Sequence, residues 1–273
     1  MKHPEYGRYD DAATEYCERV LLTVWPKLSH FHSDIAIVGG LVPRYLTQKP
    51  DRISRTIDLD VAISLAVDGE MAGSVSWALR SAGFDRLPEK GYFTRKEGNI
   101  ELIIDFLTDS PPPGGGTRAV DDISANAFPG VERAIRVVRD HRIRGIDLDG
   151  HSSEQVVRIC EVGPYLCLKL SAYADRREPK DIFDTVQMIR FYDQGTEAAQ
   201  KAFWAESGAN QAYPLARRVL ETAFLESRRG AADYADFALG PLTAGADEDK
   251  RRDHQQLVGI ALLAGRALAS SGK

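Results

Sequence analysis

Two aspartates lie within an alternating run of apolar residues, and this pattern constrains the chain more than any other feature of its sequence. From Thr56 to Leu65 every second residue is a branched aliphatic, the period-two pattern of a β-strand with one buried face. Asp58 and Asp60 share the other face, where side chains two residues apart point the same way, with bases roughly 7 Å apart. Two like charges so close favour a cationic partner, a raised pKa or a bound divalent ion. A pair of solvated carboxylates is the alternative interpretation.

A pair of glycines precedes this strand. Residues 35–38 are a short apolar run typical of a buried strand, and residues 41–46 continue with helical spacing. Gly39 and Gly40 therefore fall at a strand–helix corner, where missing side chains let a triphosphate approach backbone N–H groups and the positive end of a helix. Glycine is also the usual residue at a tight corner, so a purely steric role remains open.

A third carboxylate lies in the next strand-like segment. Residues 92–94 and 101–107 predict a hairpin that turns at residues 97–99, and Asp105 is the one charged residue between Leu102 and Leu107. Burying that carboxylate costs several kcal/mol unless a cation or a donor compensates it, which a shared metal ion would do. Capping of the following turn is the alternative role.

The order of the predicted helices and strands divides the chain into two parts. Helices and strands alternate in the first part, with a helix at 11–28, another at 70–81, further short strands at 134–138 and 143–148, and an exposed loop at 111–116. After Gly163 only helices are predicted, at 165–176, 180–192, 195–206, 213–228, 231–239 and 250–270. We expect an α/β (α+β) fold, with a mixed sheet flanked by helices in residues 1–150 and a helical domain in residues 151–273.

Composition excludes several classes of protein. With 273 residues, 43% of them apolar, the chain can bury a substantial core, and a net charge of −5 argues against broad nonspecific binding to nucleic acid. The apolar run at 257–265 is too short to span a membrane, and the polar N-terminus lacks the apolar core of a secretory signal, so we expect a cytoplasmic protein. The three cysteines and six histidines show no zinc-site spacing, and we expect the cysteines to be buried and unpaired.

Two charged residues interrupt apolar helical patterns in the second half. Lys169 lies within the apolar run 166–170, and Asp184 lies within 182–186, so each is expected to meet a polar partner. An ammonium group suits a phosphate, and Asp184 could orient it. A plain interhelical salt bridge between the two is the alternative.

The motifs together resemble a known family. The order Gly-Gly, Asp-x-Asp and a single strand Asp resembles the polymerase-β-type nucleotidyltransferase superfamily. Lys169-Leu170-Ser171-Ala172, Arg176 and residues 179–184 (Pro-Lys-Asp-Ile-Phe-Asp) resemble the signature of AbiEii/AbiGii-type toxins, the nucleotidyltransferases of type IV toxin–antitoxin systems, which are related to mycobacterial MenT toxins. The resemblance covers residues 35–190, with one departure at Glu178, where the family tends to carry a basic residue.

The resemblance implies a Mg²⁺-dependent enzyme that transfers a nucleoside monophosphate from an NTP to an acceptor, with a cognate antitoxin as partner. One or two Mg²⁺ ions are expected on Asp58, Asp60 and Asp105, with the NTP bound by Gly39, Gly40 and Lys169 and with Asp184 assisting. The expected acceptor is the 3′ end of tRNA, and the basic residues within 133–144 are the segment expected to meet RNA phosphates.

Other interpretations remain open. Transfer to a protein hydroxyl or to a small molecule such as an aminoglycoside uses the same chemistry, and a catalytically idle protein that binds nucleotide or antitoxin would keep the pocket without turnover. Thr56 shares the face of Asp58, so a phosphate added there would crowd the metal site, and the resemblance implies silencing of this kind. Threonine is also simply a good strand former.

Overall fold

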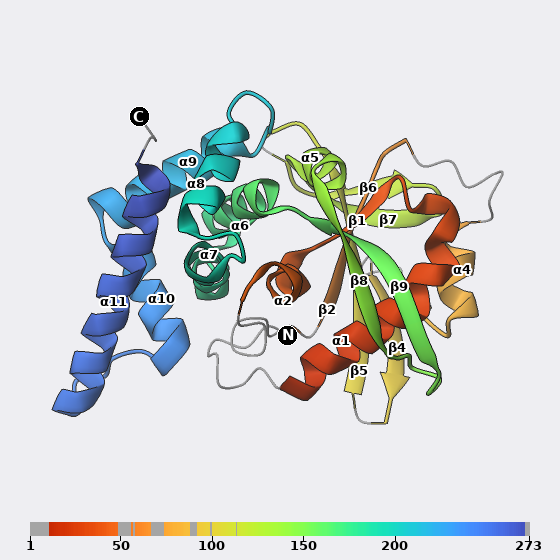
Figure 1. The fold of residues 1–273 in the computed structure, drawn as a ribbon, viewed down its shortest axis with the longest axis horizontal. Coiled ribbons are helices and arrows are strands. Elements are labelled where there is room, and N and C mark those ends of the chain that lie inside the picture. Colours follow the sequence, from red (N-terminus) through yellow and green to blue (C-terminus); the bar gives the residue numbers. More distant parts are fainter. Residues whose placement is uncertain are drawn as a thin grey trace. The chain divides into compact units, whose positions relative to one another are not determined.

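A computed structural model describes the chain over most of its length (Figure 1). The described residues are 11–48, 56, 58–66, 74–87, 92–98, 100–112 and 114–270. They form two compact units. We call residues 11–45 and 56–161 the sheet unit, and residues 46–48 and 162–270 the helical unit.

The sheet unit is built on one mixed sheet. Its spatial order is β3-β4-β5-β2-β1-β9-β8, with β7 beside β5 and β6 beside β7. The pairs β2–β5, β1–β9 and β5–β7 are parallel and the others are antiparallel. The predicted α/β class with a mixed sheet is confirmed. The strands are β1 (Ile35–Val38), β2 (Asp58–Ile63), β3 (Asp85–Leu87), β4 (Tyr92–Glu97), β5 (Ile100–Asp109), β6 (Thr117–Val120), β7 (Ile123–Phe128), β8 (Val138–Ile146) and β9 (Ser152–Cys160).

Short helices flank this sheet. Helix α1 (Asp11–Val24) packs on β2, β5, β8 and β9, and it is followed by the 3₁₀-helix η2 (Trp25–Phe31) (Figure 1). Val20, Leu21 and Val24 recur at helical spacing on the face of α1 that is buried, as the sequence predicts. The remaining helices are η3 (Gly39–Leu41), α2 (Val42–Leu46), α4 (Val75–Ser81) and α5 (Val131–Arg136). The predicted start of α4 near residue 70 lies outside the described residues.

The chain leaves the sheet later than predicted. Strand β9 pairs along its whole length with β8 and meets β1 at Ile37 and Ile159, so it belongs to the sheet. The boundary therefore lies after Glu161 rather than at residue 150. Residues 46–48 also join the helical unit, because Gln48 N–H donates to Phe191 O and Asp193 N–H donates to Leu46 O, both at 2.9 Å.

The predicted strand at 134–138 is wrong. Residues 131–136 form α5, whose buried Val131, Ala134 and Ile135 follow the i, i+3, i+4 spacing of a helix. The carboxylate of Asp109, at the end of β5, caps this helix by accepting the N–H of Glu132 at 3.1 Å. The predicted strand at 143–148 overlaps the second half of the longer strand β8, which ends at Ile146.

The helical unit contains the predicted series of helices. These are α6 (Val162–Arg176), α7 (Pro179–Phe191), α8 (Thr196–Ala205), α9 (Tyr213–Leu220), the π-helix η4 (Glu221–Glu226), α10 (Arg229–Leu239) and α11 (Glu248–Ala269). Aromatic side chains fill its centre, with Phe183 packed against Tyr234 and Phe237. Among the described helices, none has the length and apolar character needed to cross a membrane. Cys17, Cys160 and Cys167 are buried and form no disulfide, as expected.

Two glycines of the helical unit give a matched test of its packing. A Cβ on Gly163 would lie 2.6 Å from the carbonyl oxygen of Ala202, whereas no described atom lies within 4 Å of a Cβ on Gly259 in α11. We expect Gly163→Ala to destabilise the unit by about 1–3 kcal/mol through overpacking. Gly259→Ala should stabilise it by about 0.5–1 kcal/mol, because glycine is costly inside a helix. Urea unfolding of the two variants measures both changes, and equal effects would contradict the packing described.

Candidate functional site

Parallel pairing brings the three predicted carboxylates onto one face of the sheet. Asp60 of β2 lies directly opposite Asp105 of β5, and Asp58 lies two residues before Asp60. Laterally paired residues share a face, as do residues two apart along a strand, so the three acids point to the same side. The intervening Leu59 and Ile104 are fully buried on the other side. The alternation in the sequence therefore predicted this face correctly.

The glycine corner is shaped around one of these carboxylates. Gly39 has a φ of +70°, and a Cβ added there would lie 1.7 Å from Oδ2 of Asp60. Gly40 N–H donates to the same oxygen at 3.3 Å. Gly39 is therefore required both for its backbone conformation and for the room that Asp60 occupies.

The other two carboxylates also accept hydrogen bonds from side chains. Thr56 Oγ1 donates to Oδ1 of Asp58 at 2.7 Å, and Asn126 Nδ2 donates to Oδ1 of Asp105 at 2.8 Å. Each acid of the site thus has a donor from a separate segment of the chain. Asn126, on β7, did not emerge from the sequence, because a polar residue in a short strand carries no signal of its partner.

A buried thiol lies in the field of these acids. Burial raises the pKa of Cys17, in α1, well above its usual value, and the negative charges of Asp58 and Asp60 raise it further. Its Sγ lies 3.7 Å from the carbonyl oxygen of Thr56. The carboxylates therefore create a region of negative potential that favours a cation.

Thr56 is deeply buried, with 1% of its surface exposed. Its hydroxyl is engaged with Asp58, and its own N–H donates to Oγ1 of Thr14 at 3.1 Å. A phosphate added here would replace a donor with negative charge beside the acids. Modification at this residue requires local opening, and its regulatory role stays a prediction.

In the helical unit, Lys169 and Asp184 form a buried ion pair between α6 and α7. The Lys169 Nζ atom lies 2.6 Å from Oδ2 of Asp184 and 3.6 Å from Oδ1 of Asp181. Lys180 also contacts Asp184 at 2.7 Å, and Arg176 contacts Asp181 at 2.6 Å. The salt bridge considered from the sequence is thus present. The catalytic roles predicted for Lys169 and Asp184 stay predictions.

Electrostatics keep both partners charged. Burial opposes the charge on Lys169, but the carboxylates of Asp184 and Asp181 outweigh it and raise the pKa of the ammonium group. Burial likewise opposes the charge on Asp184, yet Lys169 and Lys180 together lower the pKa of that carboxyl. The cluster is therefore an ionised structural element of the helical unit at neutral pH.

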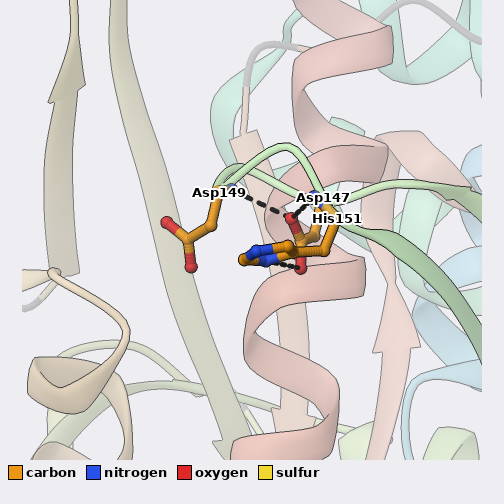
Figure 2. Close-up of side chains that lie close together, drawn as sticks. All are labelled: Asp147, Asp149 and His151. Atoms are coloured by element: carbon orange, nitrogen blue, oxygen red, sulfur yellow. Dashed lines mark hydrogen bonds and ion pairs between the residues drawn. The ribbon is translucent and has the colours of Figure 1, made fainter.

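A separate set of metal-ligand residues lies in the turn between β8 and β9 (Figure 2). There one ligand atom from each of Asp147, Asp149 and His151 approaches within 4.8 Å of the others. Within the described residues this spacing is met there and not by Asp58, Asp60 and Asp105. The histidines gave no such indication in the sequence, although the i, i+2, i+4 spacing around Gly150 was a signal that could have been used.

The side chains of this turn that could bind a metal already make hydrogen bonds and ion pairs within the chain. The carboxylate of Asp147 accepts the N–H groups of Asp149 at 3.0 Å and His151 at 2.8 Å (Figure 2). Arg95 Nη2 lies 3.4 Å from Asp149, and the His151 side chain is 79% exposed. The arrangement closes and anchors an exposed turn, and it lacks the buried polar surroundings that usually support a metal ligand.

The basic segment at 133–144 is largely paired with acids. Arg142 and Arg144 both contact Glu154 at 2.5 Å and lower the pKa of its carboxyl, and Arg139 contacts Glu161 at 2.6 Å. Most of this segment lies on β8, which is paired with β9. Its predicted contact with RNA stays a prediction, with part of its positive charge already balanced.

Comparison with known families and proteins adds no assignment. No protein-family model matches the chain, and no curated protein matches it. The resemblance to nucleotidyltransferase toxins therefore depends on the sequence motifs alone.

Replacing Gly39 tests its close approach to the carboxylate of Asp60. Gly39→Ala should lose stability twice over: about 1–2 kcal/mol for a side chain at positive φ, and a further 1–3 kcal/mol, roughly, for the collision with Asp60. Gly98, in the β4–β5 turn, has a φ of +59°, and a Cβ added there would meet no described atom within 4 Å, so Gly98→Ala should show the first cost alone. Chemical denaturation compares the two variants, and a Gly39 variant no less stable than the Gly98 variant would refute the close approach.

Acid should weaken the Lys169–Asp184 cluster. The pKa of Asp184 is lower in the folded chain than the unfolded value of about 3.9, so its contribution to stability is complete above that value and is lost as pH falls through the folded pKa. Asp184→Asn should cost about 3–5 kcal/mol at pH 7, because Lys169 loses the nearer of its two buried carboxylate partners, and should flatten the stability profile below about pH 4. Urea unfolding between pH 3 and pH 7 measures this. Asp253→Asn, on the exposed face of α11, is the matched control and should leave the profile unchanged.

Proposed function

We propose that this protein is a Mg²⁺-dependent nucleotidyltransferase that transfers a nucleoside monophosphate from an NTP to an acceptor. The observation that carries the proposal is the pairing of β2 with β5, which aligns Asp60 with Asp105 and leaves Asp58 on the same face. Three carboxylates beside a glycine corner are suited to a divalent ion and a polyphosphate. Like charges gathered in this way disfavour ionisation unless a cation or hydrogen-bond donors compensate them.

The residues fit magnesium chemically. Mg²⁺ takes oxygen ligands and is commonly held by one or two carboxylates together with substrate phosphates. Asp58, Asp60 and Asp105 would hold it, and when bound it neutralises phosphate charge and stabilises the oxygens that attack and leave. Each acid accepts a hydrogen bond from Thr56, Gly40 or Asn126, and the ion would be bound by the carboxylates held in this way.

The reaction that suits this site is in-line displacement at the α-phosphorus. The acceptor oxygen forms a bond to that phosphorus and loses its proton, while the bond to the bridging oxygen breaks and pyrophosphate leaves. The room left by Gly39 is occupied by the carboxylate of Asp60, so the corner supports the proposal by holding that acid in place. The predicted contact of Gly39 and Gly40 with the triphosphate stays a prediction. Positioning and charge stabilisation, rather than covalent chemistry, are what the chain supplies.

We further propose the 3′ end of tRNA as the acceptor and a role as the toxin of a toxin–antitoxin system. The support is the motif resemblance, from the glycine pair through the residues at 169–184. Nucleotides added to that end would prevent aminoacylation and stop growth. The transfer assay does not depend on Lys169 and Asp184, which already belong to a buried ion-pair cluster.

The decisive assay combines the protein with Mg²⁺, each α-labelled NTP in turn, and total tRNA. We expect label on RNA with at least one NTP, loss of labelling with EDTA, and at least a hundredfold lower rate for Asp60→Asn. The asparagine keeps the size of the side chain and an oxygen that can accept the Gly40 N–H. Asp85→Asn, at an exposed position on β3, is the matched control and should retain full activity.

The outcomes of this assay test the enzyme class and the tRNA acceptor separately. Labelling of protein or of an aminoglycoside instead of RNA would reject the tRNA acceptor and keep the enzyme class. No transfer and no pyrophosphate release with any acceptor would reject the enzyme. Growth arrest on expression that persists in Asp60→Asn would reject catalysis as the source of toxicity.

A further inference from the structure

Asn126 lies on the same face of the sheet as the three acids. It pairs with Leu107 across the parallel β5–β7 ladder, and Leu107 is two residues beyond Asp105 on β5. Side chains of laterally paired residues share a face, as do side chains two apart on a strand, so Asn126 and Asp105 point the same way. Strand β7 therefore adds a polar group to the carboxylate face.

In the hydrogen bond between Asn126 and Asp105, the donor and the acceptor can be assigned. An ionised carboxylate only accepts, so the amide of Asn126 must present its NH₂ group to Oδ1 of Asp105, at 2.8 Å. The acceptor is charged, which makes this bond stronger than one between neutral groups. The neighbours of Asp105 along the strand, Ile104 and Phe106, are fully buried and fix the backbone beneath it. The backbone of Asp105 is thus held by the packing of its neighbours, and its carboxylate is held separately by the hydrogen bond from Asn126.

We propose that Asn126 is a positioning residue for the divalent ion, acting through Asp105. Its amide engages one carboxylate oxygen and fixes the rotation of the group, so that the second oxygen is directed to the ion. The inference rests on the proposed function, in which Asp58, Asp60 and Asp105 bind that ion. Partners that orient metal ligands in this way typically change metal affinity by 10–100-fold when they are lost.

The other two acids of this face are held in the same way. Thr56 holds Asp58 and Gly40 holds Asp60, so every acid of the face has a donor of its own. Of these donors, the Gly40 N–H belongs to the backbone and Thr56 is deeply buried, whereas Asn126 is only partly buried. Asn126 is therefore the donor whose removal disturbs the surrounding packing least.

The experiment measures Mn²⁺ binding to the full chain in the presence of an α,β-methylene NTP, by electron paramagnetic resonance of free Mn²⁺. Asn126→Leu keeps the branching of the side chain and removes the donor, and we expect it to weaken binding by 10–100-fold. Asn126→Gln keeps an amide donor and should recover part of the loss. Ser124→Ala, two residues earlier on β7, is the matched control and should bind as the parent does.

Thermal unfolding in EDTA, run on the same variants, separates positioning from a purely structural role. A lower melting temperature for Asn126→Leu with unchanged Mn²⁺ affinity would overturn the inference. So would an equal loss of affinity in Asn126→Leu and Asn126→Gln.

Two further variants distinguish failure of the inference from failure of the proposed function. If Asp105→Asn abolishes Mn²⁺ binding while Asn126→Leu does not change it, the carboxylate site stands and the positioning role is wrong. If Asp105→Asn leaves binding intact and His151→Ala abolishes it, the ion binds the β8–β9 turn, and both proposals are wrong. No binding by the parent protein would also refute both.

Discussion

The parallel pairing of β2 with β5 is the constraint on which the candidate site depends. Its register is set from the opposite side, where Leu59, Val61, Ile104 and Phe106 are buried. A slip of one residue would carry apolar side chains to the acidic face and acids into the core. The hydrophobic effect on one face thus determines how the charges meet on the other, and the cost of gathering the acids is met by burial elsewhere in the same two strands.

Much of the fold was predictable because its patterns are local. The period-two run of β2, the strand–glycine–helix corner and the series of helices after residue 162 follow from spacing alone. The hairpin β6–β7 and strand β9 escaped prediction because their residues are mixed in polarity and their burial comes from neighbours distant in sequence. Helix α5 was mistaken for a strand because six residues are too few to separate the two periods, and its cap comes from Asp109, far back in the chain.

The candidate site was likewise predicted only in part. The sequence predicted Asp58, Asp60 and Asp105 on a common face, since strand alternation determines where each one points. It did not predict Asn126 or the contact of Asp60 with Gly40, because these depend on which strands become neighbours. For Lys169 the sequence predicted a polar partner but not its extent, a cluster of three basic side chains sharing two carboxylates.

The close approach of Gly39 and Asp60 has a consequence for how such a chain can diverge. Because the carboxylate of Asp60 fills the volume that any side chain at position 39 would need, position 39 cannot gain a side chain while Asp60 stays in place. A descendant that gains a side chain at the corner must first shorten or lose the acid at position 60. The dependence runs one way, because the positive φ of Gly39 favours glycine whatever residue stands at position 60.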